Sequence, residues 1–245
     1  MTGLAWITFG LALALAVVRI PAALRRENRL MLWLFALVAM AVLLSIEGPY
    51  LAIDAALGGI NLANLILRFL LYGICLLMAV RISRAFNALG AQRILLGPWG
   101  LAALAAAGVG TVVSFLLLGR LPSTVGLAAG DNREWFDLYA GLGRIYPSFT
   151  GLVLVPSLVR HARSSGRAVL RCSAGLLAAG YLLLASTNTF VLMPASWVAV
   201  MQTMNYSAVL LLLAGLAIIW IAGVAARRRT LAKGLPRNKS TEVKN

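Results

Sequence analysis

The sequence is poor in charged residues and in the side chains that most often perform chemistry. Only 12% of its 245 residues are charged, against about a quarter in a typical soluble domain. It has one histidine, His161, and two cysteines, Cys75 and Cys172, whose spacing suits neither a disulfide framework nor a metal site. A lone histidine has no partner ligand, which excludes a histidine-based metal or catalytic cluster. We therefore expect no cofactor and no enzyme active site, either soluble or intramembrane.

Apolar residues are abundant instead. They make up 61% of the chain, and the mean hydropathy is +0.90. The net charge of +15 would suit a nucleic-acid-binding protein, but most basic residues lie between long apolar runs. That arrangement is typical of a polytopic membrane protein, whose first partner is the lipid bilayer. The sequence thus argues against a soluble enzyme, a disordered protein and a nucleic-acid-binding domain.

Seven apolar runs approach the length of about 20 residues that a membrane-spanning helix needs. They cover residues 3–18, 30–46, 62–82, 99–118, 135–159, 168–190 and 197–225. We predict an all-α, seven-helix transmembrane domain over residues 1–226, followed by a basic, disordered cytoplasmic tail over residues 227–245. The connection 48–61 is expected to be an outer loop that could include a short interfacial helix.

Basic residues orient the predicted spans. Most of the 22 lysines and arginines fall in segments 19–29, 81–93, 160–171 and 227–244, and seven spans place all four segments on one side. Because basic segments favour the cytoplasmic side, the N-terminus is predicted outside and the C-terminus in the cytoplasm. We expect the plasma membrane of a bacterium.

Charged residues within spans are the most informative, since each costs about 2.5–3.5 kcal/mol at a helix centre on insertion scales. Arg68 and Arg144 lie six and nine residues into their runs, or about 9 and 14 Å at a rise of about 1.5 Å per residue. Other polar residues fall at similar depths in the outer halves of the runs. The predicted ligand-binding residues are Glu47, Asp54, Arg68, Asp137, Arg144, Asn188, Gln202 and Asn205.

Two interpretations of this polar band stay open. In the first, it lines an outward-facing pocket whose arginines suit an anionic or polar small molecule. In the second, Arg68 and Arg144 form ion pairs with acidic residues among these eight and only hold the bundle together. Pro147 is expected to kink the fifth span beside Arg144 and to free backbone carbonyls, which favours a site.

One part of the sequence resembles a known family. Residues 19–29 (RIPAALRRENR), 49–54 (PYLAID) and 59–65 (GINLANL) resemble the membrane half of an actinobacterial family of seven-span proteins described as transporters. Longer members of that family carry a cytosolic domain after the seventh span, which we expect to be absent here. The resemblance implies a seven-span fold and a transporter-like role, and it assigns no binding residues.

We therefore predict small-molecule binding or transport through an outward-facing polar pocket. The alternative is a signalling or scaffold subunit that binds a membrane or cytosolic protein through its spans or its basic tail.

Overall fold

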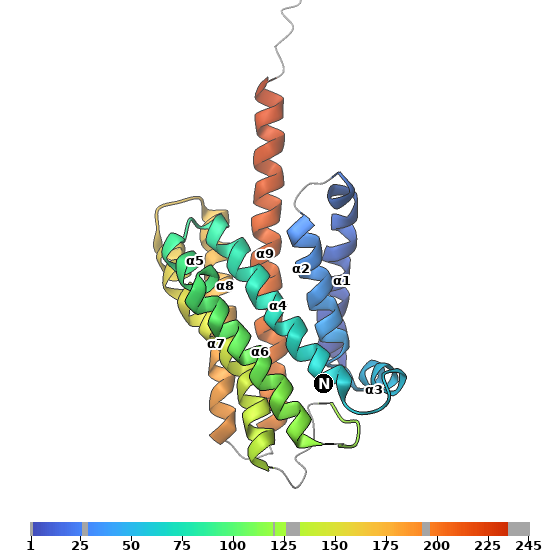
Figure 1. Ribbon diagram of the computed structural model, residues 1–245. Helices are drawn as coiled ribbons and strands as arrows, with labels where there is room; N and C mark the ends of the chain where they lie inside the picture. The colour runs from blue at the N-terminus through green and yellow to red at the C-terminus, as the bar shows by residue number, and fades with distance from the viewer. Residues whose placement is uncertain (1, 26–28, 120, 126–132, 193–196, 235–245) are drawn as a thin grey trace, which may run out of the picture.

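The computed structural model describes residues 2–25, 29–119, 121–125, 133–192 and 197–234, and every regular element within them is helical (Figure 1). The elements are α1 (Thr2–Leu24), α2 (Arg29–Leu43), α3 (Glu47–Ala56), α4 (Leu62–Ala85), α5 (Leu89–Leu96), α6 (Pro98–Leu118), α7 (Arg133–Arg163), α8 (Ala168–Ser186), the 3-10 helix η1 (Thr187–Leu192) and α9 (Val198–Gly234). The predicted all-α class is confirmed.

Within the described residues, six helices are long and apolar enough to cross a membrane, namely α1, α4, α6, α7, α8 and α9. A seventh span is obtained when α2 and α3 are counted as one bent element, with 95° between their axes. The protein is therefore an integral, multi-span membrane protein with six or seven candidate spans. Which end faces the cytoplasm stays a prediction.

The second predicted span, 30–46, is shorter and more sharply bent than expected. The Ser45 hydroxyl donates a hydrogen bond to the Val42 carbonyl (2.6 Å), which competes with continuation of α2. A new helix then begins with Glu47, whose negative charge suits a helix N-terminus. Pro49 lies in the first turn, where its missing N–H costs nothing. The chain therefore turns into α3, which is the short helix expected in this connection.

The helices gather their ends at two poles of the bundle (Figure 1). One pole holds the end of α1, the start of α2, α5, the α7–α8 connection and the C-terminal part of α9. The described residues of all four basic segments fall at this pole, which we call the basic end. The other pole, the opposite end, holds α3, residues 121–125 and η1. The charge asymmetry expected from the sequence is thus an asymmetry between the two ends of the fold.

Exposed tryptophans lie near both ends. Trp33 and Trp99 are 62% and 85% exposed and lie within or just beyond the first turn of helices that start at the basic end. Trp6, Trp135 and Trp197 are 38–47% exposed and lie close to the opposite end. Tryptophan is enriched where a membrane meets water. The two groups of tryptophans therefore have the positions expected of aromatic belts at the two membrane surfaces.

The last helix continues beyond its membrane-spanning part. Its candidate span is Val198–Ala225, which agrees with the predicted run 197–225, and α9 itself continues to Gly234. The boundary between the transmembrane domain and the tail at residue 226 stays a prediction. Arginine, leucine, alanine and lysine are good helix formers, and the first helix-stopping residues are Gly234 and Pro236. Residues 235–245 of the predicted tail lie outside the described part of the chain.

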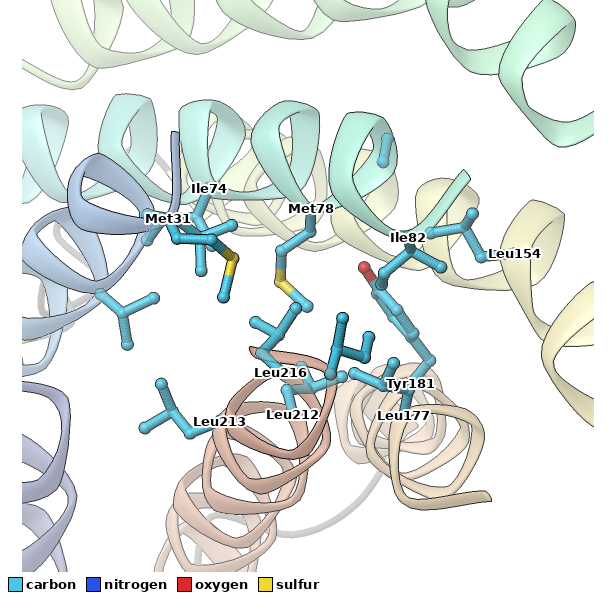
Figure 2. Close-up of a cluster of buried hydrophobic side chains, with 14 of the residues drawn as sticks. Met31, Ile74, Met78, Ile82, Leu154, Leu177, Tyr181, Leu212, Leu213 and Leu216 are labelled. Atoms are coloured by element: carbon cyan, nitrogen blue, oxygen red, sulfur yellow. The ribbon is translucent and has the colours of Figure 1, made fainter. Parts of the chain in front are cut away.

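The apolar core lies in the half of the bundle nearer the basic end. Figure 2 shows side chains from α2, α4, α7, α8 and α9 converging there. The labelled members are Met31, Ile74, Met78, Ile82, Leu154, Leu177, Tyr181, Leu212, Leu213 and Leu216. The charged residues predicted within the spans lie nearer the opposite end. The half nearer the basic end therefore contains the main apolar cluster, while the buried Asp54, Asn61 and Asn64 lie in the other half.

Glycines bring α8 and α9 into close contact. A methyl group at Gly180 would lie 2.9 Å from Leu212 Cγ, and one at Gly215 would lie 2.7 Å from Leu177 Cγ. The Ser173 hydroxyl also donates a hydrogen bond to the Gly215 carbonyl (2.8 Å). Small residues and hydrogen bonds between helices are the usual means of association inside a membrane.

Candidate functional site

The eight predicted residues do not form one cluster. Glu47, Asp137 and Gln202 are exposed. Asp54 is fully buried among α3, the start of α4 and residues 121–125. The remaining four are Arg68, Arg144, Asn188 and Asn205, and they are all partly buried. The polar band predicted from the sequence therefore separates into an exposed group, a buried hub and a group around two arginines.

Asp54 accepts hydrogen bonds from three donors. The backbone N–H groups of Asn61 and Ala63 each donate to its carboxylate at 3.0 Å, and the Ser123 hydroxyl donates a third bond. Two of these donors belong to the first turn of α4, whose N–H groups have no partner within the helix. Asp54 thus caps α4 from outside the helix and joins it to residues 121–125.

Asn61 completes this arrangement. Its Oδ1 accepts bonds from the Tyr50 hydroxyl and the Thr124 N–H, both at 3.0 Å. Its Nδ2 donates to the carbonyls of Leu121 (2.8 Å) and Pro122 (2.9 Å). An asparagine amide can make two bonds through each of these atoms, so every site is used. Its φ of 61° is left-handed, a conformation that asparagine adopts more readily than most residues.

We call Tyr50, Asp54, Asn61 and Ser123 the Asp54 hub. Its groups satisfy one another, and together they fasten α3 and the connection after α6 to the start of α4. The hub therefore has a structural role. The place of Asp54 in the lining of a ligand pocket stays a prediction.

Arg68 lies one further turn along α4 and reaches α7. Its Cζ is 5.1 Å from the centre of the Tyr139 ring, a cation–π contact. The Tyr139 hydroxyl in turn donates to Asn64 Oδ1 (2.8 Å). The guanidinium also lies against α7 where Gly143 has no side chain, and a methyl group there would overlap it. Arg68 Nε is buried and has no hydrogen-bond partner.

Arg144 follows Gly143 directly on α7 and points toward α9. Its Nη2 lies 3.7 Å from the sulfur of Met201, which is a weak acceptor. The Arg68 guanidinium lies against Gly143, so the two arginines meet α7 at consecutive residues. We call Arg68 and Arg144 the arginine pair.

The arginine pair has no counter-ion among the described residues. No carboxylate oxygen in that part of the chain lies within 4.0 Å of either guanidinium group. The ion pairs that one interpretation of the sequence expected with Glu47, Asp54 or Asp137 are therefore not formed there. The physical reason is that Asp54 is committed to the start of α4, while Glu47 and Asp137 are exposed.

Further polar groups lie one turn from Arg144. Asn188 donates to the Ser148 hydroxyl (2.6 Å) and to the Ala185 carbonyl (2.8 Å), joining the end of α8 to α7. Asn205 lies one turn along α9 from Met201. Pro147 lies inside α7, which continues past it, and it has no N–H to donate to the Gly143 carbonyl. Polar residues of α7, η1 and α9 therefore lie about one turn from Arg144 or from Met201, the residue that it contacts.

The two grooves found on the bundle lie elsewhere. One, of about 310 Å³, is lined by Leu37 and by α4 residues from Leu65 to Gly73. The other, of about 560 Å³, lies between α4 and α6 around Phe69 and Gly108. Both are lined by apolar side chains, and neither includes the arginine pair. The outward-facing polar pocket therefore stays a prediction.

Several residues that position the arginines were not among the predicted site residues. Tyr139 supports Arg68, Gly143 makes room for it, and Met201 contacts Arg144. A signal for the α4 side exists in the sequence, because Asn61, Asn64 and Arg68 recur at a spacing of three and four residues. That spacing places them on one face of a helix. The contact between α7 and α9 has no such signal.

Neither a search for metal-binding groups nor a comparison with known proteins assigns a further role to these residues. Within the described ranges, no three His, Cys, Asp or Glu side chains gather in a group that could hold a metal ion. No family model, no curated protein and no solved structure matches the chain. The resemblance to a seven-span family is thus supported only as far as a helical membrane protein with six or seven candidate spans.

Proposed function

We propose that this protein binds a small anionic or polar molecule in the plasma membrane of a bacterium, in the manner of a transporter. The observation that carries the proposal is the arginine pair, two cations within the spans with no carboxylate nearby in the described structure. Charged residues in spans are costly and commonly mark a ligand or ion pathway.

The contrast with other polar groups supports a ligand. Where polarity serves the fold, as in the Asp54 hub, donors and acceptors match each other fully. Arg68 and Arg144 instead contact a ring face and a thioether, which leave most guanidinium N–H groups available. An anion would supply the acceptors that these groups lack.

The position of the pair favours entry from the opposite end, which the charge pattern predicts to be outside. Arg68 is only six residues from the first residue of α4 at that end. Beyond the pair, toward the basic end, lies the apolar core of Figure 2. A ligand at the arginines would therefore be held above a closed apolar layer, as expected of an outward-facing state.

The test is native mass spectrometry of the full chain, purified gently from its own membrane, beside two variants. Arg144→Gln removes the proposed anchor, and Arg163→Gln removes an exposed arginine from the same helix. We expect a small molecule retained by the wild type and by Arg163→Gln and lost from Arg144→Gln. Retention by all three proteins, or by none, would contradict the proposal.

A second candidate function is supported by α9. This helix continues to Gly234, well past the other helices at the basic end (Figure 1). Its last two turns contain Arg227, Arg228, Arg229 and Lys233. A projecting basic helix suits an acidic protein partner, as in a signalling or scaffold subunit. A partner that co-purifies in fixed ratio and is lost when the chain is shortened after Ala226 would favour this function.

A further inference from the structure

We infer that the arginine pair selects a ligand group with two negative charges, as a phosphate monoester or a sulfate provides. This inference rests on the proposed function and names the chemical class of its ligand. It is carried by two observations: the Arg68 guanidinium lies against α7 at Gly143, the residue before Arg144, and no described carboxylate lies within 4.0 Å of either guanidinium group.

Charge balance is the first step. Without a ligand, two like charges lie together in a partly desolvated site, where their repulsion is weakly screened. A neutral ligand would leave both charges uncompensated, and a monoanion would leave one. A dianionic group compensates both, so the free energy of binding should improve steeply from the monoanion to the dianion. The planar guanidinium fork also matches the oxygens of a phosphate or sulfate group.

The surroundings assign the two arginines different roles. Arg68 is held between the Tyr139 ring and the bare backbone at Gly143, so it is a fixed charge. Among the described residues, Arg144 is held only by the Met201 sulfur, a weak contact that an anion can replace. Nearby, both bonds that Asn188 donates are made within the protein. Arg144 is therefore the main anchor of the anion, and Arg68 supplies the second charge.

The ligand group could belong to a soluble molecule or to a lipid headgroup. The experiment therefore measures the thermal unfolding of the full chain by tryptophan fluorescence at pH 8, in two settings. In detergent, inorganic phosphate or sulfate is compared with chloride and acetate at equal ionic strength. In nanodiscs, phosphatidylcholine is compared with phosphatidylcholine containing phosphatidic acid.

Variants separate specific binding from general salt effects, since sulfate and phosphate stabilise many proteins by exclusion from the surface. Arg144→Gln measures that general effect, and Arg163→Gln is the charge-matched control. Arg144→Lys keeps the charge without the fork, and Gly143→Ala displaces the Arg68 guanidinium. We expect a saturable rise in Tm with phosphate or sulfate in the wild type and Arg163→Gln. In Arg144→Gln the midpoint concentration should rise at least about tenfold.

The other outcomes are equally clear. A stabilisation seen only with phosphatidic acid and lost in Arg144→Gln supports the same chemistry and assigns it to a lipid. An Arg144-dependent rise of equal size with acetate or chloride overturns the dianion inference and leaves the proposed function standing. If no anion gives an effect that depends on Arg144, the inference is wrong. Mass spectrometry then decides separately whether another ligand is retained.

Discussion

The Asp54 hub fastens the start of α4, and Arg68 of the arginine pair lies further along the same helix. Both groups contain charges that a membrane protein would normally avoid. In the hub, one carboxylate accepts three hydrogen bonds, and Asn61 uses all four of its bonding positions. At the pair, the Arg68 guanidinium meets a tyrosine ring and the Arg144 guanidinium meets a thioether. Polar groups in a span can therefore be divided into two kinds, those whose hydrogen-bond partners the protein itself supplies and those whose partners it does not supply.

This difference predicts opposite responses to mutation. Removing a member of the satisfied hub strands its partners, and a stranded buried donor or acceptor costs about 1–3 kcal/mol. Removing a member of the arginine pair strands no ionic partner in the described structure. Four substitutions test this contrast, and each is measured as a change in the free energy of unfolding of the purified protein.

Asp54→Ala should have the largest effect. It leaves the N–H groups of Asn61 and Ala63 and the Ser123 hydroxyl without their acceptor. We expect a loss of about 3 kcal/mol or more. Denaturant unfolding followed by tryptophan fluorescence would measure it, with Asp137→Ala as the control, because Asp137 is an exposed aspartate. Equal losses for the two variants would show that the hub does not carry the stability assigned to it.

Asn61→Gly should have the next largest effect. Glycine keeps the left-handed φ of 61° at no steric cost but loses all four side-chain hydrogen bonds. We expect a loss of about 2 kcal/mol, smaller than for Asp54 because no charge is involved. Asn61→Ala should cost about 1 kcal/mol more, since alanine is strained at this φ. The same unfolding assay measures both variants. Identical free energies of unfolding for Asn61→Ala and Asn61→Gly would show that the left-handed backbone conformation adds no cost.

Much of this architecture could be predicted from the sequence, because each membrane-spanning helix must itself be long and apolar enough to cross lipid. The length of the apolar runs indicates the spans, and the placement of the arginines indicates which helix ends lie together, before any contact between helices is known. The bend after α2 was harder to predict. It depends on the hydrogen bond that the Ser45 hydroxyl donates to the Val42 carbonyl, and a serine in a sequence does not show whether its hydroxyl will bond to the backbone. The seventh apolar run, 197–225, agrees with the candidate span Val198–Ala225, although the helix itself continues to Gly234.

The candidate site was harder to predict for a related reason. Depth in a span indicates that a charge is costly, but it does not indicate the partner. Asp54 and Arg68 were grouped together by depth, yet Asp54 bonds to Ser123, which is 69 residues away in sequence. Pairing between distant segments decides which charges are satisfied. That pairing is a property of the packed bundle and leaves no periodic trace along the chain.

Tyr139→Phe should have a smaller effect and tests the link between the two regions. Phenylalanine keeps the ring beneath Arg68 but removes the bond that the Tyr139 hydroxyl donates to Asn64. We expect a loss of about 1 kcal/mol. Tyr139→Leu also removes the cation–π contact and should lose about 0.5–2 kcal/mol more. Thermal unfolding of both variants would measure the two steps, and equal losses would show that the ring contact contributes nothing.

Arg144→Met should change the free energy of unfolding least. We expect either a small gain or a loss of no more than about 0.5 kcal/mol. The variant keeps most of the side-chain volume, gives up one weak contact with Met201 and relieves repulsion from Arg68. Unfolding without added ligand would measure this, and ligand retention by mass spectrometry would be lost in the same sample. A drop of more than about 1 kcal/mol would show that Arg144 has a structural partner after all. Near-neutral stability with lost binding is the result that only an unsatisfied, ligand-facing charge can give.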